Sequence, residues 1–189
     1  NDSSLLIAGG FRKVGNITNL NNIVLVSEDG TYESFDGGIY GLVTCLAVTD
    51  DVIYMGGAFQ FTDESEQRVS SITSYSFKDG WSNLDEGITR GDSEHPDRPV
   101  VHSIAVSEAS DALYVGGTFV INATGPQGDL QEVASLAGWS ISYNKWFSLQ
   151  DTLLGTVRSL AVNSEQLYVG GNFTVISTNR TMWNFGLLD

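Results

Sequence analysis

The side chains that could support catalysis are few in this 189-residue chain. It has one cysteine, Cys45, and two histidines, His95 and His102. A nucleophilic thiol needs a base beside it. The segment VTCLAV around Cys45 recurs twice, with Ser103 and Ser159 at the matching place. The pattern therefore predicts a small, structural residue at Cys45 rather than a catalytic thiol.

Three vicinal acidic pairs could in principle supply the acid and base of glycoside hydrolysis. They are Asp50–Asp51, Asp63–Glu64 and Asp85–Glu86. Neighbouring residues on a strand point to opposite faces, and all three pairs lie at expected turns. The sequence also lacks a Cys/His zinc cluster, a calcium loop and a phosphate loop. We therefore expect no enzyme activity and no catalytic, cofactor-binding or metal-binding residues.

A phrase with two adjacent glycines and a phenylalanine occurs four times, as LIAGGF, YMGGAF, YVGGTF and YVGGNF. Glycine weakens the interior of a strand because it has no side chain to pack. Its recurrence predicts either a close approach of backbones around a central axis or a β-bulge. We expect the phenylalanine to pack between neighbouring units. The structural positions are Gly9, Gly10 and Phe11; Gly56, Gly57 and Phe59; Gly116, Gly117 and Phe119; and Gly170, Gly171 and Phe173.

Three further phrases recur in a fixed order around the glycine phrase. One is VTCLAV, VHSIAV or VRSLAV; another is centred on an aromatic residue; the third alternates apolar and polar residues. Four short segments in about 40–50 residues are typical of a propeller blade. The sequence therefore predicts an all-β chain of β-propeller-like four-stranded blades. We assign repeat units to 5–52, 53–112, 113–166 and a partial unit at 167–189, about three and a half repeats.

We interpret residues 1–189 as a single segment of a larger propeller, completed by the rest of a longer chain or by a second copy. The chain has 23 acidic and 9 basic residues. This balance argues against nucleic acid and against docking on anionic lipid. The sequence contains no apolar run long enough to cross a membrane, so we expect no membrane contact from this segment.

Five of the twelve asparagines begin the sequon N-x-S/T: Asn1, Asn16, Asn122, Asn172 and Asn179. This excess predicts a secreted glycoprotein. The alternative is a surface rich in Asn, Ser and Thr that carries no glycan.

Two polar insertions, at 89–100 and 121–133, are the best candidates for partner contacts, because binding residues often lie on loops of a rigid scaffold. The first contains Arg90-Gly91-Asp92, a tripeptide that some adhesion receptors recognise. Trp81 and Trp146 could stack on sugars. Tyr32 is the aligned residue of the first unit. The alternative is therefore that this recurrent aromatic residue packs in the core.

The segments LYVGGTF and LYVGGNFT, the W-S-x-L segment and G-x-V-x-S-L-A-V, in this order, resemble the fungal cortical markers for cell polarity. The resemblance implies a glycosylated, extracellular, propeller-like ectodomain on a single membrane anchor, acting in bud-site selection. It implies a non-enzymatic landmark that binds other cell-surface or cell-wall proteins, and possible glycan partners. The alternative is a secreted carbohydrate-binding or carbohydrate-acting propeller.

Overall fold

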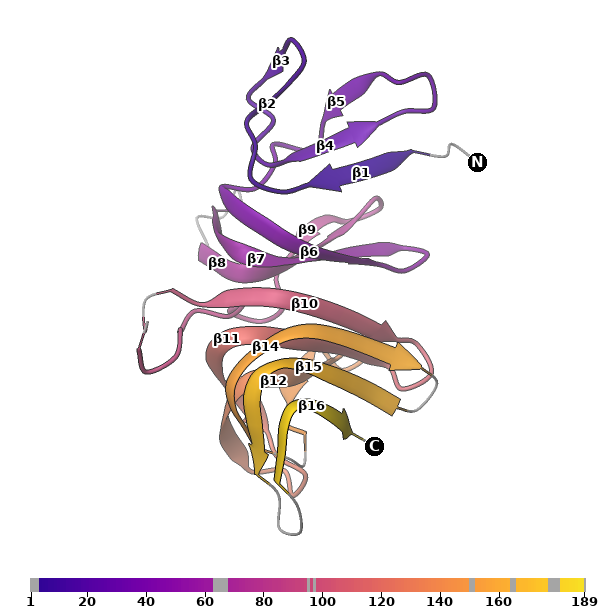
Figure 1. Ribbon diagram of the computed structural model, residues 1–189. Coiled ribbons are helices and arrows are strands. Elements are labelled where there is room, and N and C mark those ends of the chain that lie inside the picture. Colours follow the sequence, from indigo (N-terminus) through magenta and orange to yellow (C-terminus); the bar gives the residue numbers. More distant parts are fainter. Residues whose placement is uncertain are drawn as a thin grey trace.

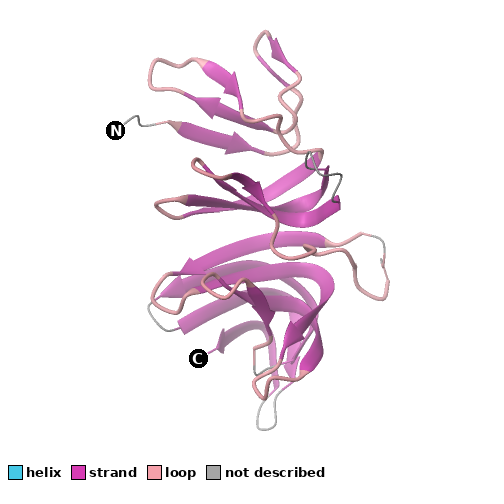
Figure 2. Ribbon diagram, turned by 180° about the vertical axis from the view of Figure 1, so that it is seen from behind, coloured by secondary structure: helices cyan, strands magenta, loops and turns pink. Residues whose placement is uncertain are grey.

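The computed structural model describes residues 4–62, 68–94, 96, 98–149, 152–163, 166–176 and 181–188. Every regular element in these ranges is a β-strand, and the strands form antiparallel sheets that stack in chain order (Figures 1 and 2). The all-β, propeller-like fold that the repeats predict is confirmed.

The two middle sheets have four strands each, in sequential order. The second sheet contains β6 (Gly41–Val48), β7 (Val52–Thr62), β8 (Arg68–Ser76) and β9 (Gly80–Ser82). The third sheet contains β10 (Val100–Ser107), β11 (Ala112–Thr124), β12 (Leu130–Ser140) and β13 (Lys145–Phe147).

The outer two sheets have three described strands each. The first sheet contains β1 (Leu5–Ala8), β4 (Ile23–Val26) and β5 (Tyr32–Ser34), and beside it lies a small hairpin of β2 (Lys13–Val14) and β3 (Ile17–Thr18). The fourth sheet contains β14 (Thr152–Asn163), β15 (Gln166–Ile176) and β16 (Thr181–Leu188).

The sheets differ in phase from the repeat units that the sequence suggests. Each four-stranded sheet begins with the VTCLAV-type strand, and the glycine phrase lies on its second strand. The units assigned from sequence begin at the glycine phrase, one strand later. The order of the phrases is the same in both descriptions, because a repeat pattern does not say which strand forms the edge of a sheet.

The last three of the four glycine pairs each face a β-bulge on the first strand of their own sheet. Val43 pairs with Gly57 and Cys45 with Gly56, so Thr44 is an extra residue on β6. The same shift occurs at the matching places in the third and fourth sheets. The bulge brings the backbone onto the second glycine, where an added Cβ would lie 2.0 Å from the carbonyl oxygen of Leu42.

The second glycine is under the same constraint in the later sheets. A Cβ on Gly117 would lie 2.0 Å from the carbonyl oxygen of Val100, and one on Gly171 would lie 2.2 Å from that of Thr156. Real Cβ atoms do not approach a backbone oxygen so closely. The structure therefore supports the β-bulge, and the close backbone approach at the second glycine is to the neighbouring strand of its own sheet rather than around a central axis.

The first glycine of the pair makes room for the next sheet instead. An added Cβ on Gly56 would lie 2.5 Å from Cγ1 of Val101, and one on Gly116 would lie 2.4 Å from Cγ1 of Val157. Both valines are fully buried and start the bulge of the following sheet. At Gly170 the nearest atom is Oγ of Ser159, at 3.2 Å.

The phenylalanine after the glycine pair belongs to the core in three of the four copies. Phe59, Phe119 and Phe173 are at most 4% exposed and lie in three different hydrophobic clusters between the stacked sheets. Phe11 differs, because β1 ends at Ala8 and the ring is only half-buried beyond the strand.

Hydrogen bonds toward the next sheet recur at one aligned position, which lies just before β4 and within β8 and β12. Asn22, Ser71 and Ser135 all have a left-handed backbone, with φ of 71°, 64° and 65°. The Asn22 amide donates to the carbonyl of Ile39 at 2.7 Å, and the Ser71 hydroxyl donates to that of Pro99 at 2.9 Å. The Ser135 hydroxyl likewise donates to the carbonyl of Gly155 on β14 of the fourth sheet.

We expect Gly117→Ala to lower the free energy of unfolding by about 3 kcal/mol, because the methyl group would overlap a backbone carbonyl that cannot move without breaking the bulge. Gly170→Ala is the matched control. Its nearest neighbour is a serine hydroxyl at 3.2 Å, so we expect a change within about 1 kcal/mol. Urea denaturation of the two variants measures both effects, and equal losses would contradict the assignment of the second glycine.

Candidate functional site

The two polar insertions lie against each other on one surface. The backbone N–H of Val120 donates to the carbonyl of Arg90 at 3.0 Å. The guanidinium of Arg90 also contacts the carboxylate of Glu132 at 3.0 Å, with side chains 51% and 64% exposed. We call residues 89–94 and 121–133 the insertion surface.

The second insertion is not the loop that the sequence predicts. Residues 121–124 continue β11 and residues 130–133 begin β12, so only the tip is a turn. In this turn the N–H of Gly125 donates to the carbonyl of Asp129 at 2.7 Å. The polar side chains of this segment suggested a loop. Alternate residues of β11 are nevertheless buried here, including Ile121 and Ala123. The long hairpin gives the insertion surface a rigid base.

The tripeptide Arg90-Gly91-Asp92 is held within the first insertion. The N–H of Gly91 donates to the carbonyl of Pro96 at 2.8 Å, and a carboxylate oxygen of Asp92 accepts from the N–H of Glu94 at 3.1 Å. An exposed ion pair such as that of Arg90 contributes under about 1 kcal/mol. Arg90 can therefore exchange its intramolecular carboxylate for one on a partner at little cost.

Three of the five sequons lie in the described residues, and their asparagines are all exposed. Asn16 lies in the turn between β2 and β3. Asn122 lies on β11 and is the register partner of Glu132, and Asn172 lies on β15 opposite Thr156. Asn1 and Asn179 fall outside the described residues. Each described asparagine has the solvent access that a glycan requires, and whether it carries one stays a prediction.

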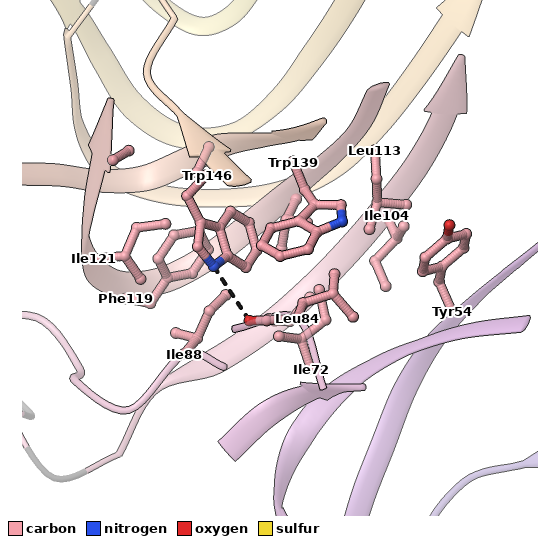
Figure 3. Packing of buried hydrophobic residues seen from close by; sticks show 14 residues of the cluster. Tyr54, Ile72, Leu84, Ile88, Ile104, Leu113, Phe119, Ile121, Trp139 and Trp146 are labelled. Atoms are coloured by element: carbon pink, nitrogen blue, oxygen red, sulfur yellow. Dashed lines mark hydrogen bonds between the residues drawn. The ribbon is translucent and has the colours of Figure 1, made fainter. Parts of the chain in front are cut away.

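The tryptophans considered for sugar stacking belong to the packing between sheets. Trp146 is 6% exposed, and its indole N–H donates to the carbonyl of Leu84 at 3.3 Å (Figure 3). Trp81 is half-buried, donates to the carbonyl of Asp36 at 3.1 Å and packs its ring 5.1 Å from Tyr75. The prediction that a sugar stacks on Trp146 is therefore wrong. The recurrent aromatic is a core residue, although Tyr32 is 39% exposed.

The thiol and the described imidazole are not arranged as a nucleophile and base. Burial raises the pKa of the Cys45 thiol to about 11, against a weaker opposing effect of the Thr44 hydroxyl. Burial, and then the charge of Arg158, lowers the pKa of His102. Its Nε2 lies 3.4 Å from Oγ1 of Thr118. A protonated thiol at neutral pH is a poor nucleophile. His95 falls outside the described residues.

The acidic pairs that the structure describes lie in solvent-exposed turns. Asp50 and Asp51 separate β6 from β7, and Asp85 and Glu86 follow β9. Asp63 and Glu64 are outside the described residues. Within the described ranges, no three His, Cys, Asp or Glu side chains gather as metal ligands. The same ranges contain no helix with the length and hydropathy to span a membrane.

Sequence reasoning located both insertions but missed that they meet. The contact joins positions 42 residues apart, and its only trace in the sequence is one basic and one acidic residue in two polar segments.

The family model described as the Rax2 C-terminal beta propeller domain matches residues 90–188. The match spans 99 of the 189 residues and includes the third sheet, the fourth sheet and almost the whole insertion surface. A comparison with curated proteins finds no match.

We expect Cys45 to resist alkylation by iodoacetamide at pH 8 in the folded chain and to react quickly in urea, where an ordinary cysteine pKa is near 8.5. The raised pKa of about 11 favours the neutral thiol. The buried neutral thiol therefore contributes fully to the free energy of unfolding below a pH of about 8.5, the pKa in the unfolded chain. This contribution is lost as the pH rises through about 11, the pKa in the folded chain. Equal alkylation rates in the folded and unfolded chain at pH 8 would show that the thiol is not protected.

Proposed function

The chain belongs to the family of the Rax2 C-terminal β-propeller domain, and from that premise we propose that it is a non-enzymatic scaffold of fungal cell polarity that marks sites of bud selection. The family match over 90–188 is the observation that carries the proposal. The chemistry of the described side chains is consistent with this role, since the described thiol is protonated and the acidic pairs are solvated.

The scaffold acts outside the cell, as the glycosylated ectodomain of a single-pass membrane protein. The sequons support this location, because the asparagines of all three described copies are exposed. N-linked glycosylation takes place only in the secretory pathway, so glycans on Asn16, Asn122 or Asn172 would fix the compartment.

The insertion surface binds a protein partner of the cell surface or cell wall. Glu132 lies on the rigid β11–β12 hairpin and Arg90 lies on the first insertion beside it. They supply one charge of each sign, and both side chains are more than half exposed. Their mutual contact costs little to open, so a partner with complementary charges can take both. Asn122 lies directly across from Glu132, so a glycan on Asn122 would lie within the insertion surface.

In cells of a budding fungus that carries this chain, we expect Glu132→Arg to disturb the choice of bud site without changing the growth rate. The substitution repels Arg90 and reverses the charge offered to a partner. Asp50→Arg is the matched control, since Asp50 is an exposed acidic residue in the β6–β7 turn. Bud positions are scored by staining of bud scars. A normal pattern with Glu132→Arg, at equal protein level, would contradict a role for the insertion surface.

When the chain is made in a eukaryotic secretory host, we expect enzymatic removal of N-glycans to lower its mass. Asn16→Gln, Asn122→Gln and Asn172→Gln should each remove one glycan, because the three side chains are exposed. Mass spectrometry of the intact protein measures each step. An unchanged mass after deglycosylation would remove the support for an extracellular location.

A further inference from the structure

A cavity of about 250 Å³ opens between the second and third sheets, where β8 turns into β9. Its apolar wall includes Leu84 and Ile141, and its polar wall includes Ser76 and the exposed Asp79 at the mouth. Tyr54 from β7 and Trp139 from β12 complete the lining. None of these residues belongs to the insertion surface.

Two residues that line the cavity stand where the preceding junction has phenylalanines, of which Phe35 is buried and Phe77 is 71% exposed. Between the first and second sheets, Phe35 packs its ring 4.7 Å from Tyr75 and 6.3 Å from Phe77. The aligned aromatic phrases place Leu84 where the first unit has Phe35, and Ile141 where the second has Phe77. Leucine and isoleucine do not fill the volume of two phenyl rings.

An aromatic pair beside this space recurs at both junctions, with Trp139 in the place of Tyr75. Tyr75 pairs with Trp81 across β8 and β9, and Trp139 pairs with Trp146 across β12 and β13. The ring centroids are 5.1 Å apart in both pairs. The packing partners are therefore retained at the second junction, and what differs is the space beside them.

Two polar groups face this space with no protein partner. Tyr54 and Trp139 are each only 4% exposed. In the part of the chain that the structure describes, neither the Tyr54 hydroxyl nor Nε1 of Trp139 makes a hydrogen bond. Figure 3 shows the indole nitrogen of Trp139 on the edge of the ring that is turned toward Tyr54. By contrast, the indole N–H of Trp146 is bonded to a carbonyl. Among the described residues, no fully covered polar side-chain atom lacks a partner. The Tyr54 hydroxyl and the Trp139 indole nitrogen are therefore open to solvent through the cavity.

The donors and acceptors define the ligand. The indole N–H of Trp139 can only donate, whereas the Tyr54 hydroxyl can both donate and accept. Leu84 and Ile141 offer apolar contacts, so the same small molecule must also carry exposed C–H groups. A ring that carries both hydroxyls and C–H groups meets these demands. Asp79 at the mouth and the formal net charge of −14 disfavour anions.

We propose that this cavity binds one neutral hexose unit of a saccharide. Its volume lies below the range of about 300–1,000 Å³ that is usual for drug-sized ligands, so it fits a single ring rather than a nucleotide. The ring enters edge-on between the sheets, with hydroxyls on Tyr54 and Trp139. The binding mode differs from stacking on an exposed tryptophan, and it does not depend on the partner surface proposed above.

The test uses methyl mannopyranoside and methyl glucopyranoside as probes at millimolar concentration, with saturation-transfer NMR and calorimetric titration on the whole chain. We expect at least one probe to bind. Tyr54→Phe should weaken binding about 3- to 10-fold, the range for loss of one hydrogen bond. Leu84→Phe should abolish binding, because it restores the ring found at Phe35. Tyr114→Phe, at the matching place of the third sheet and outside the cavity lining, should bind as the unaltered chain does.

Failure of both probes to bind the unaltered chain would overturn the proposal, and so would equal binding by the unaltered chain, Tyr54→Phe and a folded Leu84→Phe variant. If Leu84→Phe does not fold, the comparison of Tyr54→Phe with Tyr114→Phe decides the outcome. Competition with soluble mannan and with soluble β-glucan shows which polymer supplies the ring. None of these results bears on bud-site choice, so this proposal and the proposed function can fail separately.

Discussion

A backbone carbonyl pressed against a glycine is the contact on which the fold depends. In three successive sheets, the first strand bulges and its carbonyl oxygen comes so close to the second strand that no side chain fits. The bulge also turns a buried valine outward to the glycine of the sheet before it, as with Val101 and Gly56. One local irregularity therefore sets both the shape of a sheet and its distance from its neighbour.

The other contacts between sheets depend on this spacing. The left-handed Ser71 can reach the carbonyl of Pro99, and the Trp146 indole can reach that of Leu84, only because the sheets lie close together. The donors of these hydrogen bonds occupy matching positions from junction to junction, while the acceptors and the residues between them vary. Variation at Leu84 opens a cavity without disturbing the tryptophan pair beside it. A repeated frame thus leaves room for sites that occur once.

The sequence predicted the strands well because each phrase alternates in the way a half-buried strand requires. It predicted the glycine constraint, although it could not separate a bulge from a close approach. It did not predict the phase of the sheets, since edge strands and inner strands share the same phrases. The insertion at 121–133 was misread because its polar residues occupy the exposed face of a strand whose other face, at Ile121 and Ala123, is buried.

The candidate sites were harder to predict for the same reason. Arg90 and Glu132 meet through the fold, and nothing local marks them as neighbours. Trp146 reads equally well as a binding residue or a core residue until the carbonyl of Leu84 is placed beside it. The absence of a partner for Tyr54 is a property of three-dimensional packing. Sequence can supply the residue types of such a site but not the space between them.

The serial arrangement of the sheets has a mechanical consequence. The main contacts between sheets run from each one to the next along the chain, as between β6 and β10 and between β10 and β14. In such a quasi-one-dimensional stack, cohesion is a sum of nearest-neighbour terms. Tension along the stack axis therefore separates the junctions one after another, and the molecule yields in steps and lengthens while its remaining sheets keep their shape.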